Sequence, residues 1–213
     1  SEAMLDGRQS DTGSFRRQLV WREFAHDLMW NNPHLLDKPF RPKFEGFPWI
    51  GREDHWQAWV HGMTGYPIVD AASRQLLATG YIPNRARMIT ASFLTKHLLI
   101  DYRRGEDHFM KWLTDGDWIQ NNFGWQWSAG CGCDAQPYFR VFNPILQGQR
   151  FDPTGAYVRQ WVPELRDLPK KFIHTPWKAE KSLFQSRYPE PIVDHAAARK
   201  RFLDHAKGYL ASV

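Results

Sequence analysis

Residues 115–144 hold most of the side chains that could do chemistry in this 213-residue sequence. The stretch offers two acids around a glycine, a pair of amides and two tryptophans: Asp115, Gly116, Asp117, Asn121, Asn122, Trp125 and Trp127. Carboxylates accept hydrogen bonds and carboxamides both donate and accept them, while indoles are flat stacking surfaces. Together these groups could hold the polar edge and the faces of a flavin-like ring or a nucleobase.

A simpler interpretation of the same residues is structural. Taken alone, Asp-Gly-Asp followed by Trp-Gln-Trp is typical of an aromatic core turn in which an aspartate caps the next helix. Tryptophans two positions apart do not share a helical face, so Trp125 and Trp127 should meet different neighbours. The choice between the two interpretations depends on the rest of the chain.

Helical periodicity dominates the local pattern, and no stretch alternates with the two-residue period of a strand. Asp11 or Ser14 could cap the first helix, which should bury a broad apolar face; Gly80 suits a C-cap. Asp152 suits an N-cap with Pro153 at the first helical position. Helices are predicted over residues 15–30, 53–62, 67–79, 85–101, 104–113, 118–122, 154–162 and 194–209. The sequence therefore predicts an all-α, multi-helix bundle in which residues 1–213 form a single domain.

Composition narrows the class of protein. A net charge of +5 suits a polyanionic partner, and eleven tryptophans suggest ring recognition or electron chemistry, although an aromatic-rich core is the plain alternative. Cys131 and Cys133 are too close for an unstrained disulfide and have no partners for a metal site, so we expect reduced thiols and no metal. Without a membrane-length apolar run or a signal peptide, a soluble, cytoplasmic monomer is expected.

Several blocks of sequence favour the ring-binding interpretation. The segments TGYPIVDAASRQL, NRARMITASFL, LLIDYRRGE, DGDWIQNNFGWQW, YFRVFNPILQGQRFDPTGAYVRQWVPELRD and HTPWKAE follow one another in this order. From about residue 15 to about residue 177 the chain thereby resembles the DNA photolyase/cryptochrome family, in its C-terminal helical FAD-binding half. Among the members of that family it looks most like the cyclobutane pyrimidine dimer photolyases.

The resemblance implies a light-driven activity. Reduced FAD in a central cavity would absorb blue light and pass an electron to a cyclobutane pyrimidine dimer flipped out of damaged DNA, which then splits. A cryptochrome-type photoreceptor without repair activity is the alternative, and a helical scaffold that binds no cofactor is a third.

The resemblance also assigns cofactor contacts. Arg87 would pair with Asp115, and a charged pair is apt beside a ring that becomes anionic, although an ordinary buried ion pair is the plain alternative. Asn121 would face the redox-active nitrogen of the flavin, where asparagine is typical of photolyases. The residues assigned to FAD are Phe15, Arg22, Arg87, Asp115, Gly116, Asp117 and Asn121.

Contacts to the lesion and to DNA follow in the same way. Trp21 and Trp127 would stack on the flipped dimer and Asn84 would bind its edge. Gln18 stands where enzymes acting on cyclobutane dimers usually carry a glutamate, so weakened repair is expected. The residues assigned to lesion and DNA binding are Gln18, Trp21, Arg22, Glu23, Asn84, Arg85, Met88, Trp127 and Gln147.

Electron supply is the third function that the resemblance assigns. Trp125 and Trp49 match the inner and outer members of the family's tryptophan relay, but Tyr102 stands at the middle position. Because tyrosine is hard to oxidise without losing its proton, the relay should be slow or divert through another ring, such as Trp112, Trp56 or Trp59. A ring of this kind is more often an ordinary core aromatic than an electron carrier, and only the resemblance sets Trp125 and Trp49 apart from that interpretation.

Two parts of the family pattern are missing from the sequence. Family members carry an α/β antenna domain ahead of the helical half, and a segment between them whose hydroxyls and helix N-terminus hold the FAD phosphates. The domain is therefore expected to be truncated at its N-terminal side and to hold FAD weakly. A natural partner would be the missing N-terminal half of a longer parent.

Overall fold

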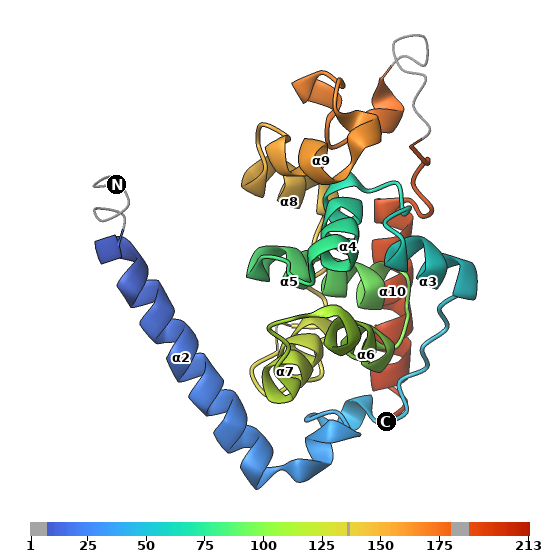
Figure 1. The fold of residues 1–213 in the computed structure, drawn as a ribbon. Coiled ribbons are helices and arrows are strands. Elements are labelled where there is room, and N and C mark those ends of the chain that lie inside the picture. Colours follow the sequence, from blue (N-terminus) through green and yellow to red (C-terminus); the bar gives the residue numbers. More distant parts are fainter. Residues whose placement is uncertain (1–7, 136, 180–187) are drawn as a thin grey trace.

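The computed structural model describes residues 8–135, 137–179 and 188–213, and every regular element in these ranges is helical. The α-helices (Figure 1) are α2 (Arg8–Asn31), α3 (Glu53–Val60), α4 (Pro67–Thr79), α5 (Asn84–Ser92), α6 (Tyr102–Trp112), α7 (Trp118–Ala129), α8 (Pro144–Phe151), α9 (Ala156–Trp161) and α10 (His195–Leu210). A π-helical turn, η3 (Phe93–His97), continues α5. Short 3₁₀ helices occur at Pro33–Leu36, Pro42–Phe44, Pro163–Leu165, Lys170–Phe172 and Pro176–Lys178. The prediction of an all-α bundle is confirmed.

The ends of α4 and α10 lie where the sequence places them. Pro67 begins α4, where its fixed φ suits the first turn, and Gly80 ends the helix with φ +68. A Cβ added at Gly80 would lie 2.6 Å from Thr114 Cγ2, so close packing also favours glycine. At α10 the carboxylate of Asp194 accepts a hydrogen bond from the Ala197 amide at 2.8 Å.

Helix α7 is longer than predicted. It continues past residue 122 to Ala129 and ends at Gly130, which has φ +95. Gly124 is a poor helix former, but burial of Trp125 and Ala129 against the core outweighs that preference. Trp125 and Trp127 therefore lie on a helix and not in a core turn.

Other predicted boundaries are also corrected. Helix α2 begins at Arg8, so Asp11 and Ser14 lie inside it and do not cap it. The helical run that starts at α5 ends with η3 at His97 and does not reach residue 101, because Leu99 adopts a left-handed φ of 53. Helix α8 was not predicted.

The start of α9 uses Asp152, though not as a simple N-cap. Gly155 occupies the cap position with φ +75, so Pro153 is outside the helix. The carboxylate of Asp152 accepts hydrogen bonds from the amides of Tyr157 at 3.1 Å and Val158 at 3.0 Å. The acid thus satisfies the first turn from a position further upstream.

The main core lies among α3 to α7 and is rich in aromatic rings. Trp59, Phe93, Phe109 and Trp125 are all at most 2% exposed there. Helix α10 packs on a separate cluster around Phe202. The aromatic population is therefore largely a packed core that surrounds one indole, Trp125, at a cavity wall.

Helix α2 does not bury the broad face that its apolar pattern predicts. Ala25 and Met29 are buried, whereas Phe15, Val20 and Trp30 are 65%, 68% and 87% exposed. Figure 1 shows the reason, because α2 stands to one side of the other helices. Among the described helices, none has the length and apolar character needed to span a membrane.

Candidate functional site

A cavity of about 750 Å³ opens between α2, α5, α7 and the C-terminal end of α6. Its size lies in the range usual for small-molecule and cofactor sites. It brings together nine residues that the sequence singled out: Phe15, Gln18, Asn84, Arg87, Met88, Asp115, Asp117, Asn121 and Trp125. The remaining lining residues are Tyr81, Ile82, Ala91, Phe109, Leu113, Gln120, Gly124 and Ser128.

Two helices present the same spacing to the cavity. On α5 the lining positions are i, i+3, i+4 and i+7, and on α7 they follow the same rule: Asn84, Arg87, Met88 and Ala91, then Asn121, Gly124, Trp125 and Ser128. This spacing defines one face of a helix. One face of each helix is therefore turned toward the same space, with small residues beside large and polar ones.

Arg87 and Asp115 form a two-point ion pair at the cavity wall. Nη2 of Arg87 donates to both carboxylate oxygens at 2.8 Å, while its Nε donates to the Ile82 carbonyl at 3.0 Å. The side chains are 26% and 48% exposed, so the pair is wet on one side. It is a fixed charge pair with room for a further polar partner.

Asp117 has a local task and a longer-range one. Its Oδ1 accepts from the amides of Ile119 and Gln120 at 3.0 Å each, which caps α7. Its Oδ2 lies 3.8 Å from Arg22 Nε and 3.7 Å from His26 Nε2. The acid therefore links α7 to α2 across the edge of the cavity, and it places Arg22 near the site without lining it.

The Asn121 side chain is fixed by a hydrogen bond to α6. Its Nδ2 donates to the Glu106 carbonyl at 2.9 Å, which fixes the amide on the cavity face of α7. The Glu106 carboxyl accepts from Asn122 Nδ2 at 3.0 Å, and burial raises its pKa to about 7. Gly116 lies between the two aspartates in the turn before α7.

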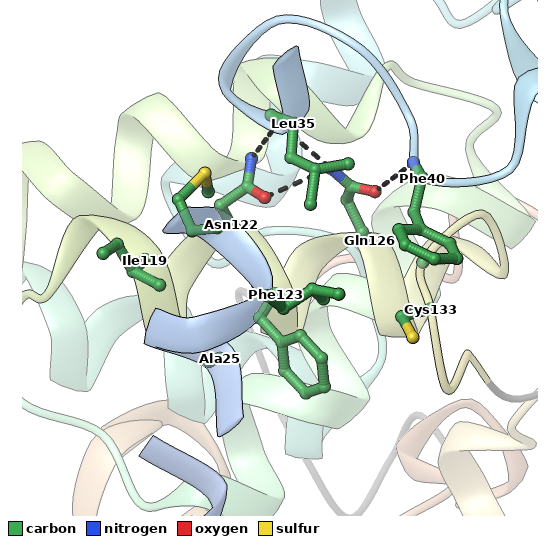
Figure 2. Close-up of a pocket in the computed structure, with 11 residues that line it drawn as sticks. Ala25, Leu35, Phe40, Ile119, Asn122, Phe123, Gln126 and Cys133 are labelled. Atoms are coloured by element: carbon green, nitrogen blue, oxygen red, sulfur yellow. Dashed lines mark hydrogen bonds between the residues drawn. The ribbon is translucent and has the colours of Figure 1, made fainter. Parts of the chain in front are cut away.

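The opposite face of α7 is tied to the 33–40 segment (Figure 2). Asn122 Nδ2 donates to the Leu35 carbonyl at 3.0 Å, and Gln126 Oε1 accepts from the Phe40 amide at 2.8 Å. Gln126 Nε2 also donates to Asn122 Oδ1 at 3.1 Å. The space among these residues is only about 10 Å³, which scarcely holds one water. This face anchors the helix, whereas the other face forms the site.

The predicted lesion contacts divide into two groups. Gln18, Asn84 and Met88 line the cavity, with Asn84 Nδ2 4.0 Å from the Met88 sulfur. Trp21 is 45% exposed on α2, with its ring 5.8 Å from Phe24. Two other predicted contacts also lie away from the lining, namely Glu23, exposed on α2, and Trp127, partly buried against the core.

Two arginines lie against one exposed ring, Phe151, and one of them, Arg85, directly follows the cavity residue Asn84 in sequence. The guanidinium of Arg85 lies 4.4 Å from the centroid of Phe151, and that of Arg150 lies 5.2 Å from the same centroid. Partial burial, and then the charges of Arg150 and Arg140, lower the pKa of Arg85. Gln147 lies on α8 with Arg150 and Phe151, and its Oε1 is buried without a hydrogen-bond partner in the described part of the chain. Arg140 and Arg150 were missed by the sequence, although Arg150 lies one helical turn from Gln147.

Of the three predicted relay residues, Trp125 lies at the cavity, and Tyr102 and Trp49 form a pair in contact with each other. Trp125 lines the cavity and contacts Phe109 and Trp59, with centroid distances of 4.9 and 6.2 Å. Tyr102 contacts Trp49 with a centroid distance of 6.3 Å.

Comparison with known proteins matches this geometry to a family. A sequence model of the FAD binding domain of DNA photolyase matches residues 15–208. The chain is 54% identical to the deoxyribodipyrimidine photo-lyase of Escherichia coli over 87% of its own length, and 47% identical to that of Neurospora crassa over 97%. The chain belongs to the DNA photolyase family, within its FAD-binding domain.

Solved structures agree. A bacterial class III photolyase from Agrobacterium tumefaciens superposes with a TM-score of 0.86 at 50% identity over 92% of this chain, and a Synechocystis cryptochrome with 0.81 at 36% over 88%. The chain spans 42% and 41% of those chains, and 40% and 36% of the two curated relatives. It thus covers well under half of the proteins it matches.

Proposed function

We propose that this chain forms the flavin-binding, catalytic part of an enzyme that uses blue light to split cyclobutane pyrimidine dimers in DNA. The observation that carries the proposal is one cavity that presents both sets of groups. The Arg87–Asp115 pair and Asn121 suit a flavin edge, and Gln18 and Asn84 suit a pyrimidine edge.

The residues present fit FAD. Arg87, held by Asp115, would bring a positive charge to a reduced flavin, which gains negative charge, and Asn121 offers an amide fixed by its bond to the Glu106 carbonyl. Phe15, Trp125 and Phe109 add apolar walls. Bound FAD would supply the electron for dimer splitting after it absorbs light. The chain's own part is to orient the ring, exclude water and hold the charges fixed.

The dimer would enter the same cavity from DNA. Gln18 and Asn84 can donate amide hydrogens to pyrimidine carbonyls, and Met88 provides an apolar contact. A dimer is already poorly stacked, so flipping it out costs less than flipping an ordinary paired base. Trp21, exposed on α2, would contact the lesion at the cavity entrance.

Phosphate binding fits the arginines near Phe151. Arg85 and Arg150 carry positive charge beside Phe151, and the charge of Arg140 acts on Arg85, on a chain with net charge +5. Such contacts contribute affinity without sequence specificity and weaken as salt rises. We therefore assign these arginines to the DNA backbone.

The experiment is a flavin titration followed by a repair assay. The protein is incubated with saturating FAD and dithionite, and blue-light loss of dimers from irradiated oligothymidine is measured. Asp115→Asn should weaken flavin binding and repair together, while the matched control Asp167→Asn, at an exposed acid outside the cavity, should change neither. Unchanged flavin affinity in Asp115→Asn would contradict the assignment of this cavity.

A further inference from the structure

A continuous line of indoles leads from the cavity wall to Trp56, which lies beside an exposed ion pair. Trp125 lines the cavity, and its ring lies 6.2 Å from Trp59, centroid to centroid, at an interplanar angle of 66°. Trp59 is stacked on Trp56 at 5.4 Å and 23°. Because Trp56 and Trp59 are three residues apart on α3, both rings project from one face of that helix.

The outer ring, Trp56, is 8% exposed and is covered by an ion pair that faces solvent. The guanidinium of Arg104 lies 4.1 Å from the centroid of Trp56, and its Nη1 is 2.6 Å from Glu53 Oε2. The Arg104 and Glu53 side chains are 43% and 61% exposed. Together they add no net charge over the ring, so the cation does not by itself prevent oxidation of Trp56.

In the part of the chain that the structure describes, no basic group accepts a hydrogen bond from Nε1 of the two inner indoles, Trp125 and Trp59. Trp125 Nε1 is buried without an acceptor among the described residues, and Trp59 Nε1 donates to the Thr90 carbonyl at 3.1 Å. A backbone carbonyl is not a base at neutral pH. An oxidised indole at either position would keep its proton and therefore remain able to take an electron from the next ring.

Tyr102 offers a poorer route. Its ring contacts Trp49 at 6.3 Å and 72°, but the residue is 4% exposed, and burial raises the pKa of its phenol far above the usual value. A tyrosine is oxidised readily only if its proton leaves. The middle position of the expected relay is thus occupied by a buried phenol, and burial disfavours loss of its proton.

We propose that electrons for flavin reduction travel along Trp56, Trp59 and Trp125, and not through Tyr102 and Trp49. This inference rests on the proposed flavin function. Trp125 would give one electron to the photoexcited oxidised flavin, Trp59 would refill Trp125, and Trp56 would refill Trp59. An external thiol then gives one electron to Trp56 and its proton to water, becoming a thiyl radical. No other bond breaks in the sequence.

A nearby tryptophan provides a matched control. Trp112 is 39% exposed on α6, and its ring contacts His108 at 6.4 Å. His108 in turn contacts Trp56 and Trp59 at 5.7 and 5.5 Å. Imidazole is much harder to oxidise than indole, so Trp112 lies near the line of indoles without belonging to it.

The test compares single substitutions in the FAD-loaded protein with thiol present. Under blue light, the loss of oxidised-flavin absorbance should slow at least about tenfold in Trp56→Phe. It should change less than about twofold in Tyr102→Phe and in Trp112→Phe. Transient absorption should show an indole radical that outlives the light pulse in the parent and decays early in Trp56→Phe. Unchanged photoreduction in Trp56→Phe, or the large loss in Tyr102→Phe instead, would overturn the proposal.

Two further measurements separate this inference from the proposed function. Dimer repair with chemically reduced flavin should be the same in Trp56→Phe and the parent, because the relay is then not needed. Near-ultraviolet circular dichroism of the protein without flavin should show a coupled-indole signal that Trp56→Phe removes and Trp112→Phe keeps. Absence of that signal in the parent would contradict the stacked pair. Failure of all variants and the parent to bind flavin would instead contradict the proposed function.

Discussion

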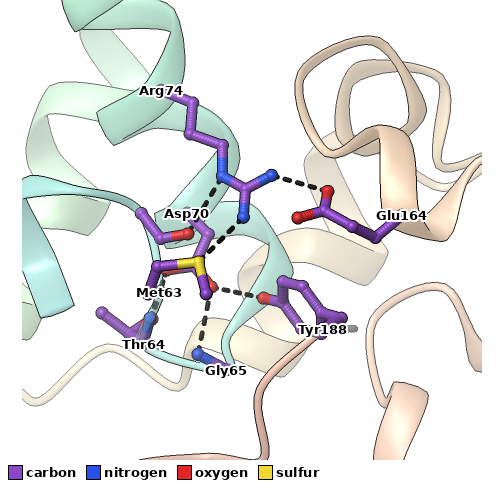
Figure 3. Close-up of polar contacts among 8 residues, drawn as sticks. Met63, Thr64, Gly65, Asp70, Arg74, Glu164 and Tyr188 are labelled. Carbon is purple, nitrogen blue, oxygen red and sulfur yellow. Dashed lines mark hydrogen bonds and ion pairs between the residues drawn. The ribbon is translucent and has the colours of Figure 1, made fainter. Parts of the chain in front are cut away.

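Two aspartates in this protein, Asp70 and Asp115, differ in their burial and in the number of hydrogen bonds that they accept. Asp70 is fully buried and accepts hydrogen bonds from the Thr64 amide at 2.8 Å, the Thr64 hydroxyl at 2.6 Å, the Gly65 amide at 3.0 Å and the Tyr188 hydroxyl (Figure 3). Asp115 is 48% exposed and pairs with Arg87 alone among the hydrogen bonds of the described residues.

This difference distinguishes an aspartate that stabilises the fold from one that can take part in ligand binding. All four donors around Asp70 come from the protein, and they join the start of α4 to Tyr188, far along the chain. Nearby, Arg74 donates to the Gly62 carbonyl at 3.0 Å, which closes the same turn. Around Asp115 and Arg87, polar capacity is left facing a cavity. A polar group whose partners are all internal holds the fold, whereas one left open at a cavity can hold a ligand.

The largest effect is expected at Asp70. In Asp70→Ala, the two amides and two hydroxyls that donate hydrogen bonds to the carboxylate lose their acceptor in a buried site. The free energy of unfolding should therefore fall by at least about 3 kcal/mol. Urea unfolding measures this loss. The matched control Asp167→Ala should stay within about 0.5 kcal/mol of the parent. Near-parent stability of Asp70→Ala would mean that the buried network contributes little.

Asp115→Asn should show the reverse pattern. The free energy of unfolding should change by less than about 1 kcal/mol, because the ion pair with Arg87 is partly exposed. Flavin affinity should fall about 10- to 100-fold, since Arg87 loses the carboxylate that orients it. Fluorescence quenching during FAD titration gives the affinity. A stability loss as large as that of Asp70→Ala would remove the distinction between the two aspartates.

An effect that is smaller over any single pH unit should appear at His97, a second internal polar group. Its Nε2 lies 2.8 Å from Nδ1 of His195, and burial lowers the pKa of His97 to about 3. Below pH about 6.5 the His97 side chain is protonated in the unfolded chain but stays neutral in the folded protein. The free energy of unfolding therefore falls as the pH decreases from about 6.5 toward 3. The slope from this group approaches about 1.4 kcal/mol per pH unit.

The slope is measured by urea unfolding at several pH values. His97→Asn should be less stable at pH 7 yet show a flatter dependence between pH 6.5 and 4. The cavity variant Asp115→Asn should keep the parent slope in that interval. An unchanged slope in His97→Asn would assign the acid sensitivity to another group.

The sequence predicted polar members of the cavity better than apolar ones. Asn84, Arg87 and Asn121 carry recognisable chemistry at family positions, so they could be named in advance. Phe109 and Leu113 also line the cavity, but an apolar side chain at helical spacing looks the same whether it faces a core or a cavity wall.

Errors in helix boundaries explain other misses. Ending α7 at residue 122 hid Gly124 and Ser128, which lie one and two turns beyond Asn121 on the cavity face. The packing of Arg85 and Arg150 against Phe151 needs α8, which was not predicted from the sequence. Contacts between elements distant in sequence decide both cases, and local pattern does not contain them.

Dimer loss from irradiated oligothymidine under blue light, with excess reduced FAD, tests the central claim most directly. The parent should repair cyclobutane dimers, and Gln18→Glu should do so more efficiently, because a carboxylate adds a charge-assisted hydrogen bond of about 1 to 3 kcal/mol. The (6-4) products, a second class of pyrimidine lesion in irradiated DNA, should be left untouched, because Asn84 and Met88 are assigned to cyclobutane dimers. Lesion binding without repair in both proteins would contradict the repair function and favour a photoreceptor, and efficient (6-4) repair would contradict the assignment of Asn84 and Met88.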